Sequence, residues 1–134
     1  MVIDTSALVA ILQNEPERQA FNAAIEAAQT RLLSVANWVE TSIVIESRFG
    51  TAGLHLLDRF LDRAGVESVA VDMRQAQEAR RAFSQFGKGR AAAGLNYGDC
   101  FAYALARTNG QPLLFKGEDF ARTDITPVIR LPHR

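Results

Sequence analysis

Short apolar runs alternate with longer amphipathic segments along this chain. The runs predict strands at 1–3, 31–35, 66–71 and 112–115, and a fifth at 125–129. Apolar residues recur at helical spacing over the segments 7–12, 16–28, 35–49, 54–61, 72–86 and 97–107. Strands joined by helical crossovers indicate an α/β protein whose parallel sheet is covered by helices on both faces.

Polar residues before the helical segments predict where several helices begin. Thr5 or Ser6, Ser34 and Asn96 are each expected to cap the helix that follows, because their side-chain oxygens can accept a free backbone N–H. The run 43–45 has the β-branched composition of a strand. Its position in a long segment without internal glycine or proline favours a helix.

Composition is that of one globular domain covering residues 1–134. The chain is 48% hydrophobic, which excludes wholesale disorder. The apolar run 7–12 is too short for a signal peptide or a membrane span, and the single cysteine, Cys100, cannot form a disulfide within the chain. We therefore expect a soluble, cytoplasmic protein without a membrane partner.

Net charge is zero, with 15 basic and 15 acidic residues, so bulk charge gives no argument for nucleic-acid binding. The two halves nevertheless differ. Residues 1–70 hold 9 acids and 5 bases, whereas residues 71–134 hold 6 acids and 10 bases. Any nucleic-acid function must therefore depend on where the charges lie.

Four acidic residues fall near the ends of predicted strands or the beginnings of the helices that follow. Asp4 follows the first strand, Glu40 lies one to two turns into the helix after the second, and Asp99 lies in the first turn of its helix. Asp119 follows the strand at 112–115 by a short loop. Ligands bind at the carboxyl ends of strands in open parallel sheets, so these acids are expected to converge.

Carboxylates brought together repel one another unless a cation compensates them. Carboxylate oxygens suit the hard ions Mg²⁺ and Mn²⁺, which can activate water and stabilise charge on a phosphoryl oxygen. Taken singly, Asp4 could be a helix cap, Asp99 could be an acid stabilised by the dipole at the start of its helix, and Asp119 could be a surface residue. Their joint placement is what indicates a metal site.

Three segments carry a resemblance to a known family. The opening Met1-Val2-Ile3-Asp4-Thr5-Ser6-Ala7-Leu8, the segment Leu95–Ala106 and the segment Leu114–Phe120 resemble the signatures of PIN domains, especially VapC-type ribonuclease toxins of toxin–antitoxin pairs. The resemblance implies a three-layer α/β/α fold with a mainly parallel sheet of four to five strands. It also implies an Mg²⁺- or Mn²⁺-dependent endoribonuclease that hydrolyses RNA phosphodiester bonds.

The same resemblance implies the roles of individual residues. The catalytic acids would be Asp4, Glu40, Asp99 and Asp119, with the metal on Asp4 and Asp99 and with Ser6 supporting the site by hydrogen bonding. Asp119 is preferred over its neighbours Glu118 and Asp124 because it directly precedes an aromatic residue. The implied partners are RNA, a small cognate antitoxin and a second copy of the chain, in a heterotetramer or larger assembly.

Basic residues offer weaker predictions. Lys88 and Arg90 lie in a glycine-rich loop just before the helix of Asp99, which makes them candidates for RNA contacts. Arg74, Arg80 and Arg81 overlap only partly on their helix, and a solvated helix face explains them as well.

Two other functions compete with the nuclease interpretation. A receiver domain also places acids at strand ends, but it needs a pair of acids early in the chain, and Asp4 stands alone. A PIN fold that has lost catalysis would be a binding module, although the presence of all four acids argues against it.

Overall fold

The computed structural model describes residues 1–89 and 91–130. Within them, the strands are β1 (Val2–Ile3), β2 (Leu32–Ser34), β3 (Glu67–Val69) and β4 (Leu113–Leu114). The helices are α1 (Thr5–Leu12), α2 (Arg18–Ala27), α3 (Val35–Arg63), α4 (Met73–Phe86) and α5 (Tyr97–Asn109). This order matches the predicted alternation of strands and helices.

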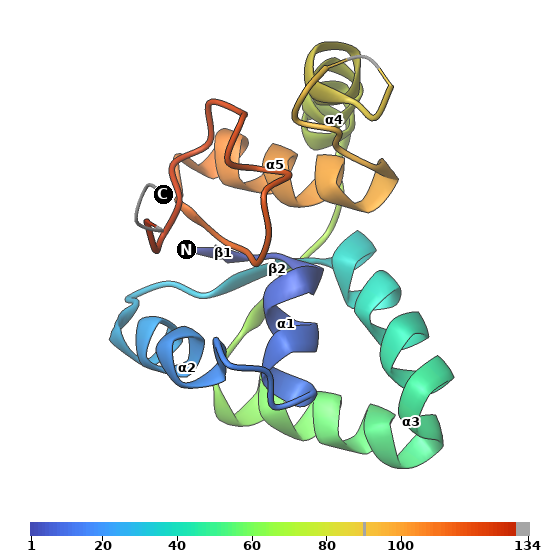
Figure 1. Cartoon of the computed structure of the whole chain (residues 1–134), viewed down its shortest axis with the longest axis vertical. Coiled ribbons are helices and arrows are strands. Elements are labelled where there is room, and N and C mark those ends of the chain that lie inside the picture. Colours follow the sequence, from blue (N-terminus) through green and yellow to red (C-terminus); the bar gives the residue numbers. More distant parts are fainter. Residues whose placement is uncertain (90, 131–134) are drawn as a thin grey trace.

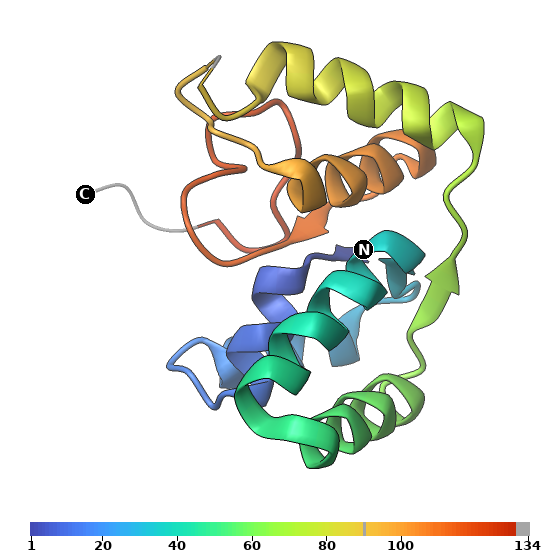
Figure 2. The same ribbon diagram turned by 90° about the vertical axis from the view of Figure 1, so that its right-hand side faces the viewer.

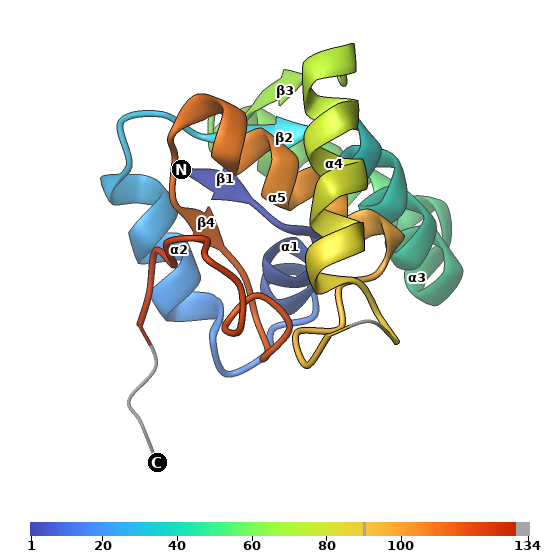
Figure 3. The ribbon, with the colours of Figure 1, turned by 90° about the horizontal axis from the view of Figure 1, so that it is seen from above.

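The strands form one parallel sheet in the order β3-β2-β1-β4. Helices α4 and α5 lie on one side of it, and α1, α2 and α3 lie on the other (Figures 1 and 2). Seen from above, α5 crosses over the strands while α1 lies beneath them (Figure 3). The structure therefore has the three-layer α/β/α architecture that the resemblance implied, with four strands.

The very short strands contribute side chains to the apolar cores on both faces of the sheet, because successive side chains point to opposite faces. Val2 and Leu113 belong to the core cluster beneath α4 and α5, together with Tyr103 and Leu105. The next residues in the two strands, Ile3 and Leu114, belong to the cluster against α1, α2 and α3. Two apolar residues in a row are enough to join two separate cores.

Helix α3 is bent rather than straight. Gly50 has φ of 66° and ψ of −160°, which interrupts the helical backbone, and Figure 2 shows the chain turning at this part of α3. Only glycine adopts this conformation at little cost. Both predicted helices are present on either side of Gly50, and the run 43–45 is helical as expected. The first half, capped by the Ser34 side chain, carries Glu40.

Two predictions of local structure were wrong. The segment 125–129 forms no strand; it makes a single bridge between Pro127 and Leu113, flanked by hydrogen bonds to Thr126 and from Val128. Proline has no N–H with which to extend a ladder. The first helix also begins earlier than predicted, at Thr5, so that Asp4 is its cap in place of Thr5 or Ser6.

None of the described helices is long and apolar enough to span a membrane.

Candidate active site

Asp4 lies at the carboxyl end of β1 and is only 2% exposed. Its Oδ2 accepts hydrogen bonds from the backbone N–H of Ser6 (3.0 Å) and from the Ser6 hydroxyl (2.6 Å). Ser6 Oγ in turn accepts the backbone N–H of Lys116 (2.9 Å), just beyond β4. Ser6 therefore fixes one oxygen of Asp4 and ties two neighbouring strand ends together, as the resemblance implied for a supporting residue.

The other oxygen of Asp4, Oδ1, is buried and has no hydrogen-bond partner in the described part of the chain. A buried carboxylate oxygen without a partner is costly, because folding removes its water without replacing it. Such an atom is expected to receive a ligand that the protein chain does not supply.

Asp99 is held at the first turn of α5 by a reciprocal pair of hydrogen bonds with Asn96. The Asn96 backbone N–H donates to Asp99 Oδ2 (3.0 Å), and the Asp99 backbone N–H donates to Asn96 Oδ1 (2.9 Å). This capping box begins the helix and fixes the Asp99 carboxylate at the same time. Capping and a site role are therefore compatible for this residue, and its Oδ1 makes no hydrogen bond to the described residues.

Glu40 reaches the same place from α3. The fully buried Asn37 uses its amide group twice, donating to Glu40 Oε1 (3.2 Å) and to the backbone carbonyl of Gly98 (3.0 Å). A Cβ atom on Gly98 would overlap with both carboxylate oxygens of Glu40. Asn37 and Gly98 thus form a clamp that holds the Glu40 carboxylate beside Asp99.

Neither Asn37 nor Gly98 was predicted as part of the site. Asn37 lies three residues before Glu40, on the same helix face, and its amide is the type of group that can hold a carboxylate. Gly98 stands in the first turn of a helix, where glycine is unfavourable, directly before Asp99. Both features were visible in the sequence. Their contact across 61 residues was not.

Asp4 and Asp99 both hold their protons unusually tightly. Burial raises the pKa of Asp4 to about 7; the Ser6 hydrogen bonds oppose this shift, and the charges of Asp99 and Glu40 add to it. Burial also raises the pKa of Asp99 to about 6, opposed by the Asn96 hydrogen bond and increased by the charges of Asp119 and Glu40. These mutual effects arise because the acids predicted from the sequence are close neighbours.

Asp119 is the exposed member of the group. It lies in the loop after β4, and the next residue, Phe120, is buried against Phe115 with ring centroids 5.2 Å apart. Asp124 is engaged elsewhere, since it accepts a hydrogen bond from Tyr103 (2.5 Å) and lies 3.8 Å from Arg107. The structure thus favours Asp119 over Asp124 as the fourth acid. Glu118 is exposed, and its side chain makes no hydrogen bond or ion pair with the described residues; its backbone carbonyl accepts the N–H of Ala121 (3.1 Å).

The chemistry of these residues fits a hard divalent cation. The donors are oxygen atoms: the carboxylates of the acids, among them the partnerless Oδ1 of the buried Asp4, and the partnerless amide Oδ1 of Asn37. Within residues 1–89 and 91–130, no three acidic, histidine or cysteine side chains already stand in a metal-ligating arrangement. The acids are close enough for their charges to raise the pKa of Asp4 and of Asp99. A bound cation would have to draw them closer before they could share it as ligands.

The predicted basic contacts are less defined. Lys88 is exposed in the loop after α4, where its backbone N–H donates to the carbonyl of Leu95 (2.8 Å). The other candidate, Arg90, lies outside the described residues.

Comparisons with known proteins agree with this picture. The family model described as PIN domain matches residues 1–125. Ribonuclease VapC30 of Mycobacterium tuberculosis is 59% identical over 128 residues, covering 96% of this chain and 98% of its own. Ribonuclease VapC of Mycolicibacterium smegmatis is 58% identical, covering 96% and 99%.

A solved structure of similar fold is VapC20 of Mycobacterium tuberculosis, described as a sarcin–ricin loop cleaving toxin. Its TM-score is 0.78 at 14% identity, with 97% of this chain and 98% of that chain covered. A DNA-bound VapBC from Salmonella typhimurium has a TM-score of 0.72 at 18% identity, covering 94% and 93%. The receiver-domain alternative is thereby set aside. The chain belongs to the PIN-domain family, as an endoribonuclease of its VapC toxin group.

Proposed function

We propose that this endoribonuclease cleaves RNA at the cluster formed by Asp4, Glu40, Asp99 and Asp119, with Mg²⁺ or Mn²⁺ held by Asp4 and Asp99. The observation that carries the proposal is the buried Oδ1 of Asp4, which has no partner in the described chain and lies in the field of two further acids. A bound divalent cation would lower the pKa of a water molecule and stabilise charge on the phosphate.

The residues of the chain prepare this site before any substrate arrives. Ser6 holds Oδ2 of Asp4, Asn96 holds Oδ2 of Asp99, and the Asn37 amide holds Glu40. Each carboxylate is therefore fixed by one oxygen and presents the other. These hydrogen bonds limit the movement of the three carboxylates, and a cation would still have to draw the acids closer before an in-line attack on a phosphodiester.

One of these carboxylates also accepts a proton from the attacking water. The pKa values of about 7 for Asp4 and about 6 for Asp99 belong to the metal-free protein, and a cation held by these two carboxylates would lower both. The exposed Asp119 lies at the edge of the cluster, on the side open to solvent. Lys88, and Arg90 outside the described residues, are proposed to contact the RNA backbone.

We propose that the protein has an antitoxin partner; its fold is shared with solved VapBC complexes, which supports this. We propose that the antitoxin is small, that it blocks the acidic cluster with a basic side chain, and that the toxin acts in the cytoplasm. A homodimer that joins the antitoxin in a heterotetramer or larger assembly completes the proposal.

Exchange of Asp4 for asparagine tests the site directly. Asp4→Asn keeps the shape and the capping oxygen but removes the charge, so RNA cleavage with Mg²⁺ or Mn²⁺ should fall at least about 100-fold. The fold, followed by circular dichroism, should remain. Chelation of metal from the unaltered protein should have the same effect on cleavage.

Asp72→Asn is a matched control for this exchange. Asp72 is also a helix N-cap, on α4, and its side chain accepts the N–H of Gln75 (2.8 Å) far from the acidic cluster. This variant should cleave RNA at the unaltered rate. Full activity in Asp4→Asn, or persistence of cleavage in chelator, would contradict the proposed site and favour a different one.

A further inference from the structure

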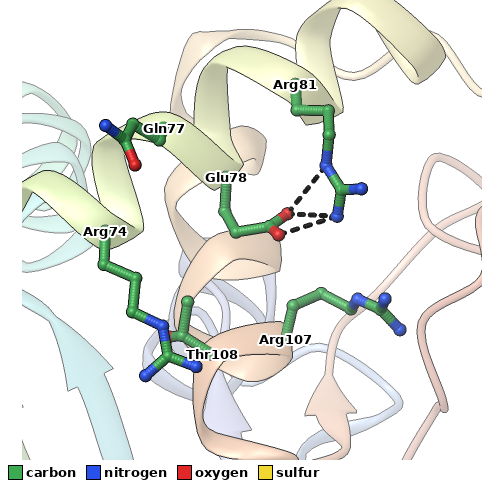
Figure 4. Close-up of a pocket in the computed structure, with 6 residues that line it drawn as sticks. All are labelled: Arg74, Gln77, Glu78, Arg81, Arg107 and Thr108. Carbon is green, nitrogen blue, oxygen red and sulfur yellow. Dashed lines mark hydrogen bonds and ion pairs between the residues drawn. The ribbon is translucent and has the colours of Figure 1, made fainter.

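A groove with a volume of about 360 Å³ lies between α4 and α5, away from the acidic cluster. Figure 4 shows side chains of α4 and of the last turns of α5 around it. The lining residues are Arg74, Gln77, Glu78, Arg81, Arg107 and Thr108. Three of these six side chains are arginines, and none is a large apolar residue.

Helical spacing explains how the arginines come together. Arg74, Glu78 and Arg81 follow one another at four and three residues, so they share one face of α4. The antiparallel neighbour α5 adds Arg107 from its C-terminal end. The prediction that Arg74 and Arg81 overlap only partly on this helix was wrong, because residues seven apart lie on nearly the same face. The groove between the two helices is wide enough for both to line it.

The charges around the groove leave it positive. Glu78 is neutralised by Arg81, whose Nη2 lies 2.7 Å from both carboxylate oxygens, as the dashed lines in Figure 4 mark. Arg107 makes only a loose ion pair with Asp124, at 3.8 Å. Arg74 makes no hydrogen bond or ion pair with the described residues. Two guanidinium groups are therefore available to a ligand.

We propose that this groove binds the phosphodiester backbone of the RNA substrate at a distance from the bond that is cut. The inference rests on the proposed function. Guanidinium groups bind phosphate oxygens through paired N–H donors. A groove lined by arginine and amide groups suits a polyanion better than the apolar centre of a protein interface.

Distance separates this groove from catalysis. Asp99 and Arg107 are eight residues apart on α5, which corresponds to about 12 Å along the helix. An RNA that reaches both must span several nucleotides. The groove should therefore strengthen binding of long RNAs and leave the chemical step and very short RNAs unaffected.

Substitution of Arg74 tests the groove, with Arg59 as a matched control. Both are exposed helical arginines without an ion pair or hydrogen bond to the described residues, and Arg59 lies on α3 in the opposite layer. In the Asp4→Asn background, binding of a labelled single-stranded RNA of about 20 nucleotides is measured by fluorescence anisotropy between about 50 and about 200 mM salt.

Arg74→Gln should weaken RNA binding roughly 3- to 10-fold, and Arg74→Glu should weaken it further. The slope of log affinity against log salt should fall by about 0.7 for Arg74→Gln, because one phosphate contact is lost. Arg59→Gln should stay within about twofold of its parent. In the active enzyme, Arg74→Gln should raise KM for the long RNA and leave kcat unchanged.

Three results would overturn the inference. Equal RNA affinity for Arg74→Gln and Arg59→Gln would overturn the groove and leave the proposed function intact. Selective loss of affinity for an oligoglutamate peptide, with RNA binding unchanged, would assign the groove to an acidic protein segment. Absence of RNA binding in every variant, including the parent, would count against the proposed function as well.

Discussion

The two ends of α5 carry charges of opposite sign, held in opposite ways. At the N-terminal end, Asp99 is buried and bound by Asn96 in a capping box, and Glu40 is held against the neighbouring Gly98. At the C-terminal end, Arg107 is exposed and has one loose ion pair. Buried charges fixed by hydrogen bonds give accurate positions, whereas exposed charges on flexible side chains give a field that water and salt screen.

This contrast predicts two kinds of sensitivity to substitution. The acidic end should respond to shape, because moving a carboxylate by a fraction of a bond length alters the reacting geometry. The basic end should respond to the number of charges and to salt, because backbone phosphates are bound mainly through electrostatics. Three changes, from the largest expected effect to the smallest, test the difference.

Adding one methyl group at Gly98 is expected to have the largest effect. Gly98→Ala places a Cβ where the Glu40 carboxylate now lies, so Glu40 must leave the clamp. We expect cleavage to fall about 100-fold, measured as kcat/KM on a single-stranded RNA. Alanine is a better helix former than glycine, so intrinsic helix propensity would not account for a loss.

The double variant Gly98→Ala with Glu40→Ala serves as the control. If the methyl group acts by displacing Glu40, its effect on activity should almost disappear once Glu40 is already removed. Equal losses from Gly98→Ala in both backgrounds would show that the methyl group acts on something else, and the clamp would not be the cause.

The stability of the metal-free protein should depend on pH in a direction set by Asp4. Its pKa is raised by burial to about 7 in the folded protein, above the ordinary value of 3.8. The folded state therefore binds this proton more tightly, and stability should fall as pH rises from about 4 to about 7, by up to roughly 1.4 kcal/mol per pH unit. Above that range the contribution is lost.

Thermal unfolding in chelator at several pH values measures this slope. Asp4→Asn, which has no proton to lose, should show a shallower slope and should be more stable than the unaltered protein near pH 8. Added Mg²⁺ should raise the melting temperature of the unaltered protein more than that of Asp4→Asn. Identical slopes for the two proteins would contradict the raised pKa.

Removing one exposed charge in the loop after α4 should have the smallest effect. Lys88→Gln takes away a single solvated cation, so KM for RNA should rise by no more than about threefold at low salt, with kcat unchanged. The difference should vanish as salt is raised. A large fall in kcat that persists in high salt would mean that Lys88 acts on the reaction itself. The contrast between fixed acids and exposed, salt-screened bases would then fail.

Much of the acidic site could be predicted because local rules place it. Asp4 follows an apolar strand, and Asp99 stands three residues after a capping Asn96, so each is positioned by its own few neighbours. The cap of α1 was assigned to the wrong residue for a related reason. Asp4, Thr5 and Ser6 can all cap a helix, and only the hydrogen bonds of the folded chain distinguish them.

The clamp could not be predicted because it joins parts of the chain that are far apart. Asn37 donates to the carbonyl of Gly98 across 61 residues, and this bond exists only after α3 and α5 pack against the sheet. The arginine groove has the same origin, since Arg107 and Arg74 line one groove only because α4 and α5 run antiparallel.

By itself, the sequence determined the alternation of strands and helices, the two apolar layers and which acids follow the strands. These follow from hydrophobic period and capping chemistry, which act between near neighbours. Only the tertiary structure decided that the Glu40 carboxylate packs against Gly98 and that Oδ1 of Asp4 is buried without a partner. It also decided that Asp124 accepts a hydrogen bond from Tyr103 instead of joining the acidic cluster. Burial and contact between distant segments are properties of the packed chain, because the distances that define them do not exist before folding.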